Sequence, residues 1–210
     1  QASANAATTF TIVNAVVDDE KTLTVDGTAL TSTVLTVDAA AEANGKLTIN
    51  GGGGDDVITI SQSDHGDSIT GGAGNDTFKA ALGSLASTDT IVGGSDTADV
   101  LMFTSSGSLG TEITDAQFTK VTGIETLTSS ANTIELFGDI DSLAAAAGLD
   151  TVTFVSTDDV DEQIAIGSGF SNDLTVNIVS DRADVVATNY TKKLTVDMGS
   201  TAVASTNDFT

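Results

Sequence analysis

The sequence predicts an all-β protein built as a β-solenoid or a short parallel β-roll. Short apolar segments recur along the chain, and the residues between them are mostly Gly, Asp, Asn and Ser, which favour turns. The tetrapeptide LTVD begins at Leu23 and again at Leu35, and LTIN begins at Leu47, so the spacing is twelve residues each time. Segments of this length and spacing predict successive rungs of stacked sheet.

The apolar segments continue less regularly after residue 50. Their central residues are Ile58, Ile69, Phe78, Ile91 and Leu101. We expect a solenoid with calcium-binding turns over residues 1–105, followed by a β-rich assembly region with one or two short helices over residues 106–210. One continuous elongated domain is the alternative to this division, and an ordinary β-sandwich is the alternative to the solenoid.

The composition limits the partners of the chain. Its 210 residues include 30 Asp plus Glu and 7 Lys plus Arg, which gives a formal charge of −23. This charge repels nucleic acid, so we expect no nucleic-acid partner, and it favours multivalent cations. Cysteine is absent, which excludes disulfides and thiolate metal sites. No apolar run approaches the roughly 20 residues of a membrane span, so we expect no transmembrane segment.

The start of the chain lacks Met, a basic segment and an apolar stretch. We therefore expect the sequence to be a mature or excised piece of a longer chain.

Two segments fit the nonapeptide GGxGxDxUx, in which U is a large apolar residue. Residues 51–59 read GGGGDDVIT and residues 71–79 read GGAGNDTFK. A calcium ion takes about 6 to 8 oxygen ligands, which glycine carbonyls and an aspartate in a tight turn supply. The sequence therefore predicts Ca²⁺ sites in these turns. The candidate ligands are Gly51, Gly53, Asp55, Asp56, Gly71, Ala73, Asn75 and Asp76.

Two degenerate copies add further candidates. DHGDSIT keeps Asp67 before Ile69 but lacks the glycine pair, and GGSDTADVL keeps Gly93 and Asp99 with a different interior. The alternative is that all of these segments are ordinary Gly/Asp turns without an ion.

The two intact nonapeptides resemble the repeats-in-toxin, or haemolysin-type, calcium-binding repeats. This resemblance implies calcium held between successive turns of a parallel β-roll by aspartates and glycine carbonyls, in a secreted protein. Residues 114–128 and 141–154 resemble segments of bacterial surface-layer proteins and large adhesins that contain calcium repeats. These resemblances imply a location on the bacterial cell surface or in the extracellular matrix.

The second half also carries local signals. Thr114 and Gln117 form a capping-box pattern for a short helix, and Asp141 can cap a helix over residues 142–147. The acidic run over residues 158–162 is expected to be a solvated loop, with a further cation site as the alternative. Strands are predicted at residues 124–127, 152–155, 163–166, 173–179 and 193–196.

No catalytic constellation is visible. The single histidine, His65, lies in a glycine-containing turn, and the metalloprotease and serine-hydrolase motifs are absent. We therefore expect no enzyme activity, and instead a calcium-stabilised structural protein that assembles with copies of itself. The alternatives are an adhesin module that binds a cell-surface polysaccharide or another surface, and the non-catalytic tail of a secreted hydrolase. No regular Thr array across equal coils is seen, which argues against ice binding.

Overall fold

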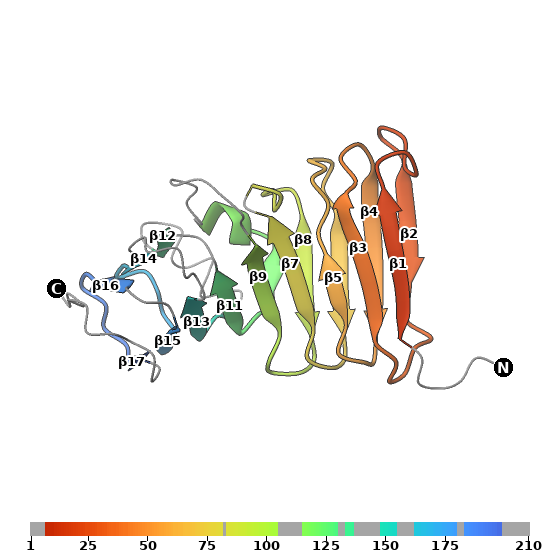
Figure 1. The fold of residues 1–210 in the computed structure, drawn as a ribbon. Coiled ribbons are helices and arrows are strands. Elements are labelled where there is room, and N and C mark those ends of the chain that lie inside the picture. Colours follow the sequence, from red (N-terminus) through yellow and green to blue (C-terminus); the bar gives the residue numbers. More distant parts are fainter. Residues whose placement is uncertain are drawn as a thin grey trace.

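The computed structural model describes residues 7–81, 83–104, 115–129, 133–136, 148–154, 162–179 and 183–198. Its strands all pair in parallel and form a β-solenoid (Figure 1). In chain order they are β1 (Thr8–Val13), β2 (Thr22–Asp26), β3 (Leu35–Ala41), β4 (Lys46–Gly52), β5 (Val57–Thr59), β6 (Ser68–Gly72), β7 (Thr77–Ala81), β8 (Thr90–Gly94), β9 (Val100–Thr104), β10 (Val121–Thr122), β11 (Thr126–Ser129), β12 (Thr133–Leu136), β13 (Thr151–Phe154), β14 (Glu162–Ile166), β15 (Leu174–Ile178), β16 (Ala183–Ala187) and β17 (Leu194–Met198).

Consecutive strands alternate between facing sheets. The odd-numbered strands form one nine-stranded sheet from β1 to β17. The even-numbered strands from β2 to β10 form a five-stranded sheet, and β12, β14 and β16 form a three-stranded sheet. We call one strand of the large sheet together with the following strand of a smaller sheet a rung. The prediction of a β-solenoid is confirmed.

The twelve-residue spacing of the LTVD segments is half a rung. Leu23 on β2 pairs with Leu47 on β4, whereas Leu35 lies between them on β3 in the opposite sheet. The chain therefore crosses from one sheet to the other and back in 24 residues at this end of the solenoid.

The core is a ladder of apolar side chains that the register places one above the other. Val37 pairs with Ile58, Ile58 with Phe78, and Phe78 with Leu101. All four side chains are fully or almost fully buried. The corresponding steps of 21, 20 and 23 residues show that the rungs differ in length and that the turns absorb the difference.

The large sheet crosses the predicted boundary at residue 105. Strand β9 pairs directly with β11, so the nine-stranded sheet is continuous across it. What changes there is the opposing sheet, which is the five-stranded one up to β10 and the three-stranded one from β12 on.

The predicted strands of the second half correspond to β11, β13, β14, β15 and β17, with ends that differ by up to two residues. The helix predicted near Thr114 is a 3-10 helix, η1 (Asp115–Phe118). The helix predicted over residues 142–147 and most of the acidic run, residues 158–161, lie outside the described residues.

The register also shows a threonine column that the sequence analysis did not find. It lies on the outer face of the nine-stranded sheet, and none of its members is buried. Unequal rung lengths hide it in the sequence. The column consists of Thr9, Thr36, Val57, Thr77, Val100, Thr126, Thr151, Thr175 and Thr195.

Candidate functional site: the glycine edge

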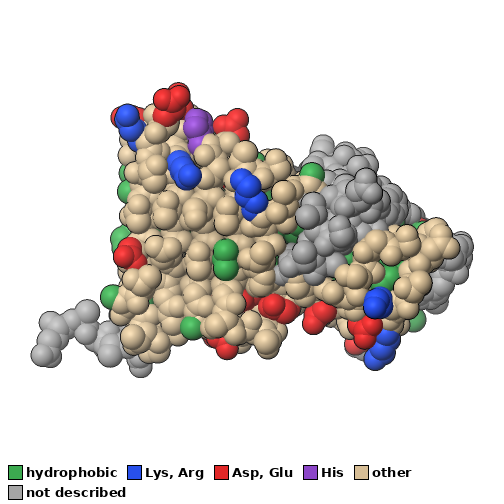
Figure 2. All heavy atoms as spheres, turned by 180° about the vertical axis from the view of Figure 1, so that it is seen from behind, with side chains coloured by type: hydrophobic (Ala, Val, Ile, Leu, Met, Phe, Trp, Pro, Cys, Tyr) green, Lys and Arg blue, Asp and Glu red, His purple; other side chains and the backbone are tan. Residues whose placement is uncertain are grey.

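The turns between the sheets form two opposite edges of the solenoid. We call the turns over residues 51–56, 71–76, 93–99 and 123–125, which lead into the nine-stranded sheet, the glycine edge. The turns over residues 42–45, 60–67 and 83–89 lead out of that sheet, and we call them the histidine edge. Seen from behind, acidic side chains gather along both edges, and the single histidine lies among those at one of them (Figure 2).

Three buried aspartates stack along the glycine edge. Each of them stands directly before a strand of the large sheet and is at most 1% exposed. They are Asp56 before β5, Asp76 before β7 and Asp99 before β9. The Oδ1 atom of Asp76 accepts the backbone amide of Asp56 at 2.8 Å, and Oδ1 of Asp99 accepts that of Asp76 at 2.8 Å. Leu35 donates to Asp56 in the same way at 2.7 Å. One oxygen of each carboxylate therefore ties its rung to the preceding one.

The second oxygen of each carboxylate has no protein partner. The Oδ2 atoms of Asp56, Asp76 and Asp99 are buried and accept no hydrogen bond of good geometry, although the Gly52 amide lies close enough to the Asp56 carboxylate to oppose the rise of its pKa. Among the described residues, no Lys or Arg forms an ion pair with any of them. An unpaired carboxylate oxygen in a buried position is costly, so the three in successive rungs make these turns the candidate site for a cation.

Glycines let the backbone approach these oxygens closely. A Cβ atom on Gly51 would collide with Oδ2 of Asp56 and with the carbonyl oxygen of Gly71. A Cβ on Gly71 would likewise meet Oδ2 of Asp76 and, at 2.6 Å, the carbonyl oxygen of Gly93. Each carboxylate oxygen therefore lies close to a backbone carbonyl oxygen, and both lie against a glycine that has no side chain to keep them away. This is a donor set of hard oxygen atoms, which suits calcium.

Burial and mutual repulsion raise the pKa values of the stacked carboxyls. Burial is the largest cause for Asp76, followed among the raising causes by the negative charges of Asp56 and Asp99, and its pKa is raised to about 7. The pKa values of Asp56 and Asp99 are also raised, chiefly by burial. A bound cation would favour the ionised forms and offset this repulsion.

The remaining predicted ligands of the nonapeptides lie further out. Asp55, Ala73 and Asn75 are exposed, and Gly53 is half-buried. Oδ1 of Asp55 accepts the amide of Asn75 at 2.9 Å, which forms a second, outer connection between the same rungs. The structure thus separates the predicted set into an inner layer with unpaired oxygens and an outer, solvated layer.

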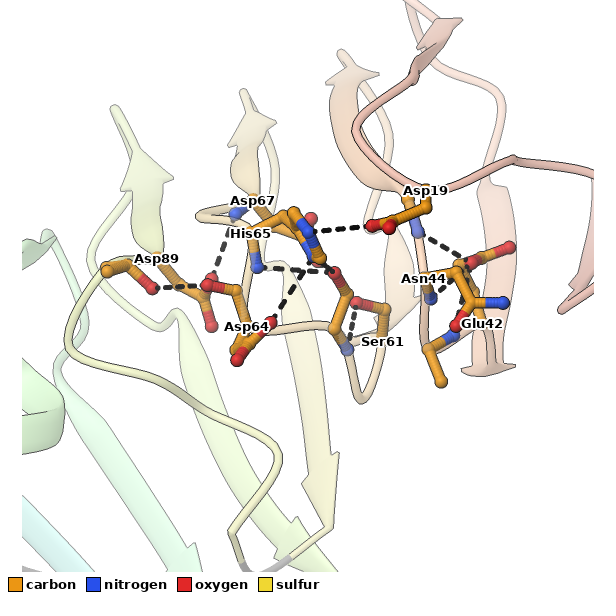
Figure 3. A network of polar contacts seen from close by, with 12 residues as sticks. Asp19, Glu42, Asn44, Ser61, Asp64, His65, Asp67 and Asp89 are labelled. Atoms are coloured by element: carbon orange, nitrogen blue, oxygen red, sulfur yellow. Dashed lines mark hydrogen bonds and ion pairs between the residues drawn. The ribbon is translucent and has the colours of Figure 1, made fainter.

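Asp67 lies on the histidine edge, away from the three stacked aspartates. Its Oδ1 accepts the amide of Leu47 at 2.8 Å and its Oδ2 accepts the hydroxyl of Ser61 at 2.6 Å (Figure 3). Asp89 on the next rung accepts the amides of Asp67 and Ala86 with its two oxygens. Protein groups therefore satisfy both oxygens of Asp67 and both oxygens of Asp89, and these contacts connect the turns of the two rungs.

Glu42 is the exception at the histidine edge. Its Oε1 accepts the amides of Asn44 and Gly45 at 2.8 and 2.9 Å, while its Oε2 is buried without a partner. Glu42 therefore has a single buried oxygen without a partner, whereas the glycine edge has such an oxygen on three successive rungs.

His65 links a serine and an aspartate but does not form a hydrolytic triad. Its Nδ1 lies 3.1 Å from the Ser63 hydroxyl and its Nε2 lies 3.1 Å from Oδ1 of Asp19 (Figure 3). Ser63 is 1% exposed, so a substrate cannot reach its hydroxyl. A triad requires an accessible nucleophile.

Two acidic residues on the glycine edge were missed by the sequence analysis. The register continues the column of Asp56, Asp76 and Asp99 through Glu125 to Asp150. The signal was present as an acidic residue two positions before each core residue, in DVI, DTF, DVL, ETL and DTV. No glycine pair precedes Glu125 or Asp150, so the GGxGxD pattern does not include them.

No three or more Asp, Glu or His side chains of the described residues form a metal-binding cluster. Each stacked aspartate instead places one carboxylate oxygen near one backbone carbonyl oxygen. The described part of the chain also has no helix long and apolar enough to cross a membrane. No protein-family model, curated protein or solved structure matches the chain.

Proposed function

We propose that this chain is a calcium-stabilised, non-enzymatic structural module. The observation that carries the proposal is the column of unpaired, buried Oδ2 atoms of Asp56, Asp76 and Asp99. The histidine edge is the internal comparison, since its two buried aspartates, Asp67 and Asp89, have protein partners for both oxygens.

Calcium fits this column better than magnesium does. Carbonyl oxygens of successive rungs are separated by the strand spacing of about 4.7–4.9 Å. Mg²⁺ demands near-ideal octahedral geometry at about 2.0–2.1 Å, whereas Ca²⁺ accepts irregular oxygen sets at about 2.3–2.6 Å. Water would complete the coordination of each ion. The ion would supply the positive charge that the turns lack.

Far-ultraviolet circular dichroism tests this proposal. Protein freed of metal by a chelating resin should lose β signal and melting temperature. Calcium should restore both, and the same concentration of magnesium should restore much less. Equal β signal and melting temperature with and without calcium would overturn the proposal.

We further propose that the module is secreted and acts at the bacterial cell surface or in the extracellular matrix, where it assembles with copies of itself. The supporting features are the acidic composition, the lack of cysteine and the resemblance to calcium repeats. A further feature is the position of exposed apolar side chains. In the described part of the chain, the large ones are Phe10, Val13, Val16, Val179 and Met198.

These side chains lie at or near the two ends of the stack. Phe10 and Val13 are on β1, the outermost described strand at one end, and Met198 is on β17 at the other. Phe10 pairs with the buried Val37, so it occupies the next position of the core ladder, but its side chain is exposed to solvent. Electron microscopy of the wild type should show filaments or sheets with calcium, and Phe10→Lys should prevent them. Single particles in both samples at all calcium concentrations would exclude self-assembly.

An adhesin module that binds a polysaccharide surface is the second candidate. The threonine column favours it, because four consecutive members carry hydroxyl groups at the strand spacing of about 4.7–4.9 Å. They are Thr126, Thr151, Thr175 and Thr195. Such an array suits an ordered surface that carries hydroxyl groups. Single polysaccharide chains fit less well, since the chain has one Tyr and no Trp for sugar stacking.

A pull-down with insoluble cellulose or chitin tests this candidate. Thr151→Lys and Thr175→Lys alter the column, and Thr48→Lys and Thr90→Lys alter the outer face of the opposite sheet. Loss of binding only in the first pair would support the adhesin function. Absence of binding by the wild type would exclude it for these surfaces.

A further inference from the structure

The column of carboxylates continues past the glycine-rich repeats. Asp99 follows the incomplete segment GGSDTAD, and the next rung has only Gly123, Ile124 and Glu125 before its strand. Neither turn fits GGxGxD. The arrangement of oxygen atoms is nevertheless the same as in the two rungs that do fit it.

Asp99 has the same bonding as Asp56 and Asp76. It is 0% exposed, its Oδ1 accepts the amide of Asp76, and its Oδ2 has no partner. This oxygen is therefore a buried, unpartnered acceptor on a rung where the motif predicts no complete site.

The carbonyl oxygen of Gly123 takes the place that Gly71 and Gly93 occupy in the preceding rungs. A Cβ on Gly93 would collide with this carbonyl oxygen and would meet Oδ2 of Asp99 at 2.5 Å. Gly123 has φ of +64°, a left-handed conformation that favours glycine, so the chain turns here without a second glycine. The two oxygens both lie close to Gly93, as the corresponding oxygens lie close to Gly51 and Gly71.

Glu125 replaces the aspartate of the next rung. Its Oε2 accepts the amide of Asp99 at 3.0 Å, which is the bond that Asp76 makes to Asp56. The longer glutamate side chain compensates for the shorter turn, which has a single residue between Gly123 and Glu125. Its carboxylate adds a second negative charge next to Asp99, and no Lys or Arg of the described residues forms an ion pair with either.

We propose that Asp99, Gly123 and Glu125 form a further site for a hard divalent cation, of the calcium class, between the rungs of β9 and β11. Asp99 Oδ2 and the Gly123 carbonyl bind the ion, and the Glu125 carboxylate holds the Asp99 rung in place and balances the charge. This inference rests on the proposed calcium function. It adds a site that joins the five-stranded part of the solenoid to the part beyond it, because β10 is the last strand of that sheet.

The experiment counts calcium ions on the full chain by equilibrium dialysis with radioactive calcium. The variants are Asp99→Asn and Glu125→Gln, each of which keeps an oxygen that accepts the same amide but removes one charge. Asp67→Asn is the matched control, since both oxygens of Asp67 have protein partners. Circular dichroism in calcium verifies the fold of each variant.

Asp99→Asn should bind about one calcium ion fewer per chain than the wild type. Glu125→Gln should weaken the same ion at least tenfold, and Asp67→Asn should leave the count unchanged. Unchanged counts and affinities in both Asp99→Asn and Glu125→Gln, with a wild type that binds calcium, would overturn this inference alone. A wild type that binds no calcium would overturn the proposed function as well.

Discussion

Asp76 joins two neighbouring rungs with one carboxylate oxygen and leaves the other unpaired. Its Oδ1 accepts the amide of Asp56 at 2.8 Å, and its Oδ2 is buried without a partner beside Gly71. The first contact explains how the turns stack in register. The second leaves a buried carboxylate oxygen without a partner, and the described residues provide no Lys or Arg ion pair there.

Removing the carboxylates of Asp76 and Asp67 should have different effects. Asp76→Ala should abolish high-affinity calcium binding at its rung. Asp67→Ala should leave calcium binding intact but destabilise the fold by about 1–3 kcal/mol, because buried amide and hydroxyl groups lose their acceptor. Calorimetric calcium titration and urea unfolding of both variants measure the two effects. Equal losses of calcium affinity would place a full site at Asp67.

Glycine at position 51 should be required for the ion. Gly51→Ala places a methyl group against Oδ2 of Asp56 and the Gly71 carbonyl, so it should lower both calcium affinity and stability, the latter by about 1–3 kcal/mol. Gly83→Ala is the control, because Gly83 has φ of +85° and no neighbouring atom within 4 Å. It should lower stability through backbone strain while calcium affinity stays unchanged. Full calcium affinity in Gly51→Ala would contradict the proposed position of the ion.

Stability without calcium should fall as the pH rises from about 4 to about 7. The pKa of Asp76 is about 7 in the folded chain and about 3.9 for an unfolded one, so the folded state retains a proton that the unfolded state has released. Such a group stabilises the fold less as it ionises. With saturating calcium the trend should reverse, since the ion binds the ionised carboxylates.

Urea unfolding at several pH values, with and without calcium, measures this dependence. Asp76→Asn should flatten the calcium-free slope, because the titrating group is gone. Identical slopes with and without calcium would show that no ion binds the titrating carboxyls.

The solenoid could be predicted from the sequence because each rung carries its own short pattern of apolar and turn residues. Each rung repeats a core residue such as Ile58 or Phe78 between turn residues, and this pattern survives changes in rung length. Sheet alternation was not predictable from spacing alone, since Leu23, Leu35 and Leu47 are equally spaced but Leu35 lies in the other sheet.

The candidate site was predicted in part. The glycine motif identified Asp56 and Asp76, but Asp67 looked similar in sequence and its role depends on Ser61, which reaches its second oxygen only in the folded turn. Glu125 was missed because its importance follows from the register with Asp99, across 26 residues. The threonine column was missed for the same reason.

The most direct test of the central claim is a crystal structure of the chain grown with calcium, with anomalous diffraction data that locate the ions. Anomalous peaks should lie within about 2.3–2.6 Å of Oδ2 of Asp56 and of Asp76, between successive turns of the glycine edge. Water molecules or empty space at these two positions, in crystals that contain calcium in excess, would contradict the claim.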